Sequence, residues 1–151
     1  FALQVLYQTD LSGCLGVETS RDSSSALWAS QLEDGGVTGS AADSEEIEFA
    51  ESLVRGVSER LEEIDSLIES ASVNWRLIRM PAVDRNILRL ATYELVATEG
   101  TPASVCINEA VELAKRFGEK ESGSFVNGIL DRIARVTGRG GRGKGKRRSK
   151  R

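Results

Sequence analysis

The stretch PAVDRNILRLATYELVATEGTPASVCINEAVELAKRFG, residues 81–118, contains two consecutive helical patterns and decides the fold class. Pro81 stands at the start of the first pattern, where a missing backbone N–H costs little. Gly100 is expected to end this helix, and Thr101 and Pro102 are expected to begin the next one. The apolar side chains of the first helix recur at spacings of three and four, which places them on one face: Val83, Ile87, Leu90, Ala91 and Leu95.

The second of these helices is expected to end at Gly118, a residue type that commonly follows the last helical turn. Its predicted inward side chains are Val105, Ala110, Val111, Ala114 and Phe117. Cys106 lies in the apolar run SVCIN and is interpreted as a buried thiol without a redox or metal-binding role. Glu94, among apolar residues of the first helix, is predicted to be partly buried and to pair with Arg85 or Arg89.

Helical periodicity continues on both sides of this stretch. It predicts a first helix over residues 1–11, a weaker one over 23–33, and a last one over 121–136. It also predicts one long helix from residue 43 or 44 to about residue 70, with a possible bend at Gly56. No convincing strand-like alternation is present in the sequence. The prediction is therefore an all-α fold of about six or seven helices.

Composition and charge indicate one ordinary domain followed by a basic tail. The chain has 151 residues and a net charge of −3, but residues 138–151 carry eight Lys/Arg and no acid. The first 137 residues hold 12 basic and 23 acidic side chains, a charge near −11. We therefore expect a domain over 1–137 and a disordered tail over 138–151. The tail either binds phosphate groups or acidic surfaces, or is surrounded by solvent alone.

Several classes of protein are disfavoured by what the sequence lacks. It has no histidine and only two cysteines, so it offers no usual metal site, no Ser/His or Cys/His nucleophile and no cofactor loop. No apolar run approaches the roughly 20 residues that span a bilayer, and a cytoplasmic protein is expected. Because the chain starts at Phe1 within an apolar pattern, we expect its natural N-terminus to be missing.

Three motifs in the second half carry a resemblance to a known family. They are MPAVDRNILRLATYEL at 80–95, INEAVELAKRFG at 107–118 and SFVNGILDRIA at 124–134. In this order and spacing they closely resemble the NusB family of bacterial transcription antitermination factors. VLYQTDL at 5–11 and LVRGVSERLEEIDSLI at 53–68 resemble it more loosely. The resemblance implies two small packed helical bundles and a binding function, without catalytic residues, metal or cofactor.

The resemblance also implies an RNA site. Family members bind the boxA element of nascent ribosomal RNA, and by this resemblance Tyr7, Glu121, Phe125 and Asn127 are the RNA-binding candidates. Tyr7 and Phe125 are flat groups on which unstacked bases can lie, although each can also be interpreted as a core residue. Asn127 could instead bond a neighbouring carbonyl group. Gly128 is expected where two helices, or a helix and RNA, approach closely.

Protein partners are implied in the same way. The resemblance places Asp84 at the surface that meets a NusE-type ribosomal protein, within an RNA polymerase antitermination complex. The main alternative is the NusB-like domain of a ribosomal RNA cytosine methyltransferase, but the glycines of the tail follow no strand and open no helix. A protein-interaction module without RNA binding is the other alternative. Family members also carry an arginine-rich segment ahead of the first helix, and this sequence begins after that place.

Overall fold

The computed structural model describes residues 2–11, 41–73, 75–98 and 100–139. Within these ranges there is no strand and no helix long and apolar enough to cross a membrane. The predicted all-α fold is confirmed, whereas the helix predicted over 23–33 lies outside the described residues. The described helices are α1 (Ala2–Leu11), α3 (Ala41–Glu59), α4 (Leu61–Ala71), the 3-10 helix η1 (Leu77–Arg79), α5 (Ala82–Ala97), α6 (Ala103–Phe117) and α7 (Ser122–Val136).

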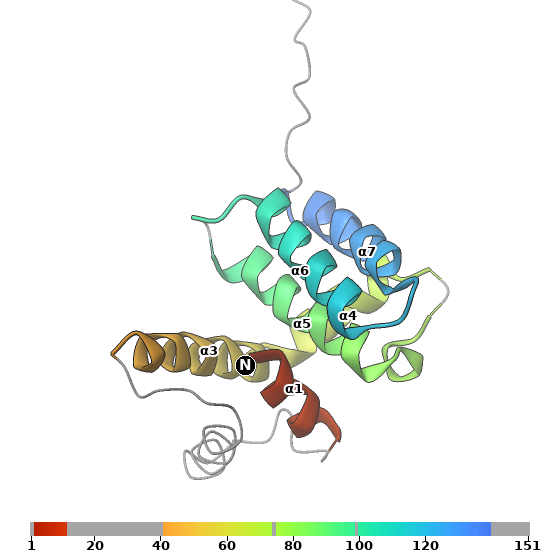
Figure 1. Ribbon diagram of the computed structural model, residues 1–151. Helices are drawn as coiled ribbons and strands as arrows, with labels where there is room; N and C mark the ends of the chain where they lie inside the picture. The colour runs from red at the N-terminus through yellow and green to blue at the C-terminus, as the bar shows by residue number, and fades with distance from the viewer. Residues whose placement is uncertain (1, 12–40, 74, 99, 140–151) are drawn as a thin grey trace, which may run out of the picture.

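Helix α5 is the centre of the arrangement. It contacts α1, α3, α4, α6 and α7, and so belongs to both groups of helices. In Figure 1, α5, α6 and α7 lie side by side, while α1 and the long α3 gather at the opposite side of α5. The all-round contact explains why this helix buries nine residues, polar as well as apolar ones. Two amphipathic helical groups thus share one apolar core.

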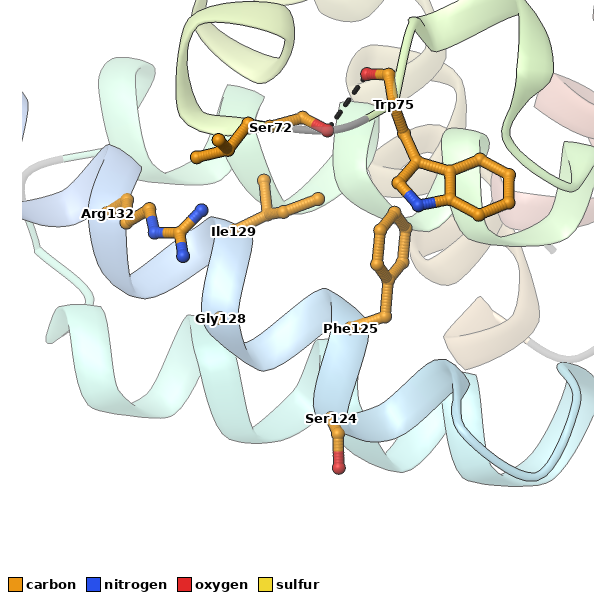
Figure 2. A pocket seen from close by; sticks show the side chains of 8 residues that line it. Ser72, Trp75, Ser124, Phe125, Gly128, Ile129 and Arg132 are labelled. Atoms are coloured by element: carbon orange, nitrogen blue, oxygen red, sulfur yellow. Dashed lines mark hydrogen bonds between the residues drawn. The ribbon is translucent and has the colours of Figure 1, made fainter.

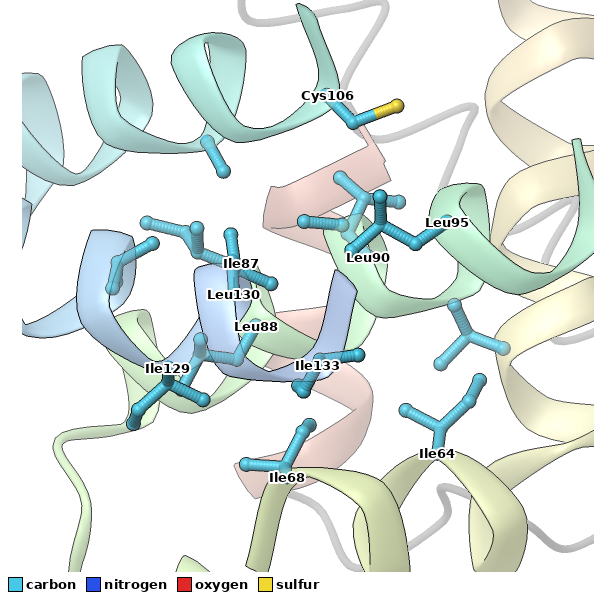
Figure 3. Packing of buried hydrophobic residues seen from close by; sticks show 14 of the residues in the cluster. Ile64, Ile68, Ile87, Leu88, Leu90, Leu95, Cys106, Ile129, Leu130 and Ile133 are labelled. Atoms are coloured by element: carbon cyan, nitrogen blue, oxygen red, sulfur yellow. The ribbon is translucent and has the colours of Figure 1, made fainter. Parts of the chain in front are cut away.

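The core lies between α4, α5, α6 and α7, as Figure 3 shows. Burying a large aliphatic side chain contributes roughly 1.5–3 kcal/mol, so these side chains dominate the stability of the fold. Leu6 and Val57 extend the core toward α1 and α3. The largest fully buried apolar side chains are Leu6, Val57, Ile64, Ile68, Ile87, Leu88, Leu95, Val126, Leu130 and Ile133.

The fully buried side chains of helix α6 are all small, while Ile107 and Leu113 pack against the core and are only partly buried. Its buried residues are Ala103, Cys106, Ala110 and Ala114. The expected burial of Cys106 is confirmed, but the predicted inward positions of Val105 and Phe117 are wrong, because both side chains are exposed. Because this face carries small residues, α5 and α7 can approach α6 closely. Val105 and Phe117 lie on the other side of α6 and face solvent.

The long helix predicted from residue 43 to about residue 70 is in fact two helices. Helix α3 ends at Glu59 and α4 begins at Leu61, with Arg60 between them at φ −113° and ψ 21°. The break lies four residues after Gly56, where we had expected a bend. A Cβ atom at Gly56 would lie 2.1 Å from the Tyr93 ring. Glycine at this position lets the Tyr93 ring of α5 pack directly against α3, and a larger residue would displace that ring.

A polar network joins α1 to α5 and α4. The Asp10 carboxylate accepts from Arg85 Nε at 2.8 Å and from Asn86 Nδ2 at 3.0 Å. Arg89 Nη1 lies 3.3 Å from the same carboxylate, and Arg89 Nε donates to Asp65 Oδ1 at 2.9 Å. Burial alone would raise the pKa of Asp10, but these hydrogen bonds and positive charges outweigh it and hold the pKa below 3.8.

This network overturns the partner predicted for Glu94. Arg85 and Arg89 pair with the aspartates of α1 and α4, so neither guanidinium is in an ion pair with Glu94. Glu94 instead lies near Cys106 and Glu109. Burial and the Glu109 charge raise its pKa, and a hydrogen bond with Cys106 offsets part of that rise. Asp10 and Asp65 pair with the two arginines in place of Glu94 because they approach from neighbouring helices. Sequence spacing along α5 does not reveal this proximity.

Candidate nucleic-acid interface

Two aromatic rings form the centre of the candidate site. Trp75 lies in the connection between α4 and η1, and its side chain is 52% exposed. Phe125, in the first turn of α7, is half-buried against the core. The ring centroids are 6.5 Å apart and the ring planes meet at 71°, an edge-to-face arrangement. Ser72 Oγ donates to the Trp75 carbonyl at 2.9 Å, which ties Trp75 to the end of α4 (Figure 2).

One side of this aromatic pair opens into a groove of about 270 Å³, which we call the Arg132 groove. The Arg132 guanidinium borders it and donates from Nη1 to the Ala71 carbonyl at 2.8 Å. Figure 2 shows that Phe125, Gly128, Ile129 and Arg132 follow one another along α7, facing Trp75 and the end of α4. The groove is lined by Ser72, Val73, Trp75, Ser124, Phe125, Gly128, Ile129 and Arg132.

Gly128 has a different role from close helix packing. A Cβ atom at Gly128 would meet nothing within 4 Å, because the position borders the open Arg132 groove. The close approach of helices occurs at Gly123 instead, where a Cβ atom would lie 3.3 Å from Lys115 Cγ of α6. The prediction of a helix–helix contact at Gly128 was therefore wrong, and an approach of RNA at this position stays a prediction. Gly128 keeps the floor of the groove free of a side chain.

The other side of the aromatic pair opens into a second cavity of about 230 Å³, which we call the Asp84 pocket. The segment ESGS, residues 121–124, and the preceding Glu119 shape it. Ser122 Oγ accepts the Glu119 N–H at 2.9 Å, and the Ser122 hydroxyl hydrogen-bonds to Asp84. These contacts fasten the start of α7 to the first turn of α5. The pocket is lined by Trp75, Pro81, Asp84, Glu119, Glu121, Ser122 and Phe125.

Asp84 is buried, which differs from the exposed position that we expected at a protein interface. Its relative exposure is 4%, and its Oδ1 atom has no hydrogen-bond partner. Burial raises the pKa of the carboxyl, the Ser122 hydrogen bond lowers it in part, and the Glu119 charge raises it again. A buried acid with a raised pKa beside a cavity is a frequent feature of functional sites.

The structure brings together only some of the predicted site residues. Glu121 and Phe125 line the Asp84 pocket together with Asp84, so one of the two predicted binding surfaces continues into the other. Asn127 is exposed on α7 and Tyr7 is half-exposed on α1, and neither lines the groove or the pocket. Their predicted roles in RNA binding stay predictions.

Trp75 is the site residue that sequence reasoning missed. It belongs to a short connection without helical periodicity, so no pattern marked it. The available signal was an aromatic residue next to Arg76 in a short connection, a combination that suits nucleic acids. With Phe125 it offers two ring surfaces, and the Arg132 groove adds hydroxyl groups and a guanidinium. Such a surface can stack unpaired bases and hold a phosphate group.

The fold and this site define a small all-α protein with a groove that is bordered by two aromatic rings and an arginine side chain. The sequence pattern described as the NusB family matches residues 1–135. The chain therefore belongs to the NusB family.

Individual relatives agree with this assignment. A transcription antitermination protein NusB of Anaeromyxobacter dehalogenans is 45% identical over 133 residues, which cover 88% of this chain and 84% of the relative. The NusB of Syntrophotalea carbinolica is 65% identical over 89 residues, and this match spans only 59% of the chain and 57% of the relative. A solved structure described as antitermination factors NusB and NusE in complex with double-stranded RNA matches with a TM-score of 0.70 and 29% identity, covering 89% of this chain and 91% of the solved one.

Proposed function

We propose that this chain is a transcription antitermination factor that binds boxA-type single-stranded RNA together with a NusE-type small-subunit ribosomal protein. The observation that carries the proposal is the Trp75–Phe125 pair beside the Arg132 groove, in a chain of the NusB family. The rings stack on bases, and Arg132 contacts a phosphate group. Binding to the nascent transcript as part of the RNA polymerase antitermination complex prevents premature termination.

The proposed role is that of a binding protein and not of an enzyme. Relatives that cover most of this chain carry the name of transcription antitermination proteins, which supports this role over that of a methyltransferase domain. The protein acts in the cytoplasm, where nascent transcripts and ribosomal proteins meet. Tyr7 and Asn127 extend the RNA surface beyond the groove, and Glu121 limits affinity at its edge because its charge repels phosphate groups.

The proposal is tested by measuring fluorescence anisotropy of labelled RNA with the chain alone and with the NusE-type protein. We expect boxA RNA to bind more tightly than a scrambled RNA of the same composition, and the partner to tighten boxA binding further. Equal affinity for the two RNAs, with and without the partner, would contradict the proposal. Partner binding without any RNA binding would identify a protein-interaction module instead.

A prediction for the basic tail follows from counterion release. Deleting residues 140–151 removes seven Lys/Arg side chains but keeps Arg139, which donates to the carbonyls of Thr98 and Thr101 at 2.6 and 2.7 Å. Affinity for every RNA should fall, and the slope of log K against log salt should become shallower by up to about five. The ratio of boxA to scrambled affinity should stay the same, because phosphate contacts carry no sequence information. A salt titration measures both quantities. If the ratio of boxA to scrambled affinity fell to one, the tail would be the segment that recognises the RNA sequence.

A further inference from the structure

Helix α7 connects the aromatic pair to the start of the basic tail. Phe125, Gly128 and Arg132 follow one another along the side of α7 that borders the groove (Figure 2), and the helix ends at Val136. Gly138 has a φ angle of 73°, a conformation that favours glycine, and it turns the chain out of the helix. The groove that begins at the two rings therefore ends on the side where the chain leaves α7.

Arg139 holds the chain in place after this turn. Its Nη2 atom donates to the carbonyl groups of Thr98 and Thr101 at 2.6 and 2.7 Å, in the connection between α5 and α6. The helical rise and the length of the chain place the Cα atoms of Arg139 and Arg132 at most about 17 Å apart. Phe125 lies about 10 Å from Arg132 in the opposite direction along α7. The start of the tail is therefore fixed at the Arg132 end of the groove.

The two ends of the groove differ in charge. Residues 140–151 lie outside the described part of the chain, and their sequence carries seven Lys/Arg and no acid. At the Phe125 end, the exposed charged residues in the turn before α7 and beside Trp75 are Glu119, Lys120, Glu121 and Arg76. These four charges cancel, whereas the seven cations that follow Arg139 have no acid among them. The excess of positive charge therefore lies at the Arg132 end.

The attachment of the tail decides which part of an RNA these cations meet. Residues 140–151 can span at most about 40 Å, and a tethered group binds most readily to what lies near its attachment. An RNA strand that stacks on the Trp75–Phe125 pair and passes Arg132 continues toward the end of α7. Its next phosphate groups lie nearest to the tail. Nucleotides that leave the groove at the aromatic end are farther away by the length of the groove.

We propose that the tail binds the phosphate groups of the nucleotides that leave the groove past Arg132, rather than those on the other side of boxA. The preferred ligand is thus boxA-type RNA with a single-stranded continuation on one side only. This inference rests on the proposed function, because recognition of boxA fixes the position of the strand in the groove. The tail adds affinity without sequence preference, since phosphate contacts carry no sequence information.

The test compares boxA RNA without flanks with boxA RNA that carries about ten unpaired nucleotides, a length that the tail can cover, either upstream or downstream. One flank should raise the affinity of the wild-type chain about tenfold or more at low salt, and steepen the slope of log K against log salt by up to about five. The other flank should change affinity by less than about twofold, because it adds few phosphate contacts. Replacing the seven Lys/Arg of residues 140–151 with glutamine keeps the length of the tail and should make the two flanked RNAs bind equally.

Scrambled RNA is the matched control, because it has no fixed position in the groove and its two flanks should act alike. A photoreactive thiouridine in the first nucleotide of the favoured flank should cross-link to the chain after Arg132 and not to the connection around Trp75. If the two flanks of boxA act alike, if the glutamine tail keeps the gain, or if the cross-link falls at Trp75, the inference is wrong while the proposed function stands. If unflanked boxA binds no better than scrambled RNA, with and without the NusE-type protein, the proposed function itself fails and the inference fails with it.

Discussion

Replacing Asp10 with alanine is expected to lower the free energy of unfolding by about 3 kcal/mol. The carboxylate is the shared partner of Arg85, Asn86 and Arg89, and the Arg89 side chain is only 7% exposed. Its removal leaves Arg85 Nε without its acceptor and takes a negative charge away from two largely buried guanidinium groups, those of Arg85 and Arg89. The loss stays at the lower end of the range for buried pairs, because Arg89 keeps its bond to Asp65. Urea unfolding followed by circular dichroism measures the effect.

The matched control is Asp131→Ala, which removes an exposed ion pair with Arg135 on α7. It should change stability by about 0.5 kcal/mol or less. Equal losses in the two variants would show that the Asp10 network contributes no more than a surface pair.

The pH dependence of the Asp10 effect has a definite sign. The pKa of Asp10 in the folded protein lies below its ordinary value of 3.8, so its contribution is fully present above that pH. As pH falls below 3.8 and through the folded pKa, the carboxylate is protonated and the contribution is lost. The difference in stability between wild type and Asp10→Ala should therefore shrink in that window. A difference that stayed constant down to pH 2 would contradict an ionic role.

The Asp10 network also bears on the proposed function, because it fixes α1 against α5. Tyr7 lies on α1, one turn before Asp10, and its position depends on how that helix is held. Packing of Leu6 into the core supplies the apolar part of this attachment. The network supplies the directional part, since hydrogen bonds fix orientation more strictly than apolar contacts do.

The sequence was sufficient for the existence and type of the helices. Periodicity along α5 identified the face that holds Ile87 and Leu95, because burial of one helix face is what produces the pattern. It also predicted the last helix, α7, which buries Leu130 and Ile133. It could not locate the break at Arg60, since α3 and α4 continue the same spacing of three and four. Long-range pairing was also invisible: Asp10 and Arg85 are 75 residues apart, and only packing brings them together.

The candidate site was predictable in part. The resemblance to the NusB family singled out Phe125, and the structure places it in the wall of both cavities. Trp75 was missed because a short irregular connection carries no period. The burial of Asp84 was missed because an acid in the first turn of a helix normally faces solvent and the helix dipole. Here the ESGS turn covers it, a tertiary contact that the local pattern does not encode.

Phe125→Leu is expected to weaken boxA binding by roughly 5- to 150-fold, the range for losing one stacked base. Leucine keeps apolar contact with the core but offers no flat surface. Trp75→Ala should have a similar effect, because the indole is largely exposed and its removal opens no core cavity. Phe125→Tyr keeps the ring and should retain most of the affinity. Anisotropy titrations with boxA and scrambled RNA, with circular dichroism to verify folding, measure these effects.

Gly128→Val provides an independent test of where the RNA lies. Because a Cβ atom at Gly128 meets nothing within 4 Å, a larger side chain should leave the fold intact and project into the Arg132 groove. Valine is also a better helix former than glycine, so stability should not fall. We expect boxA affinity to drop at least tenfold while affinity for the NusE-type protein is kept. If Gly128→Val binds boxA as wild type does, while Phe125→Leu does not, then the RNA contacts Phe125 without entering the groove, and Arg132 has no part in binding.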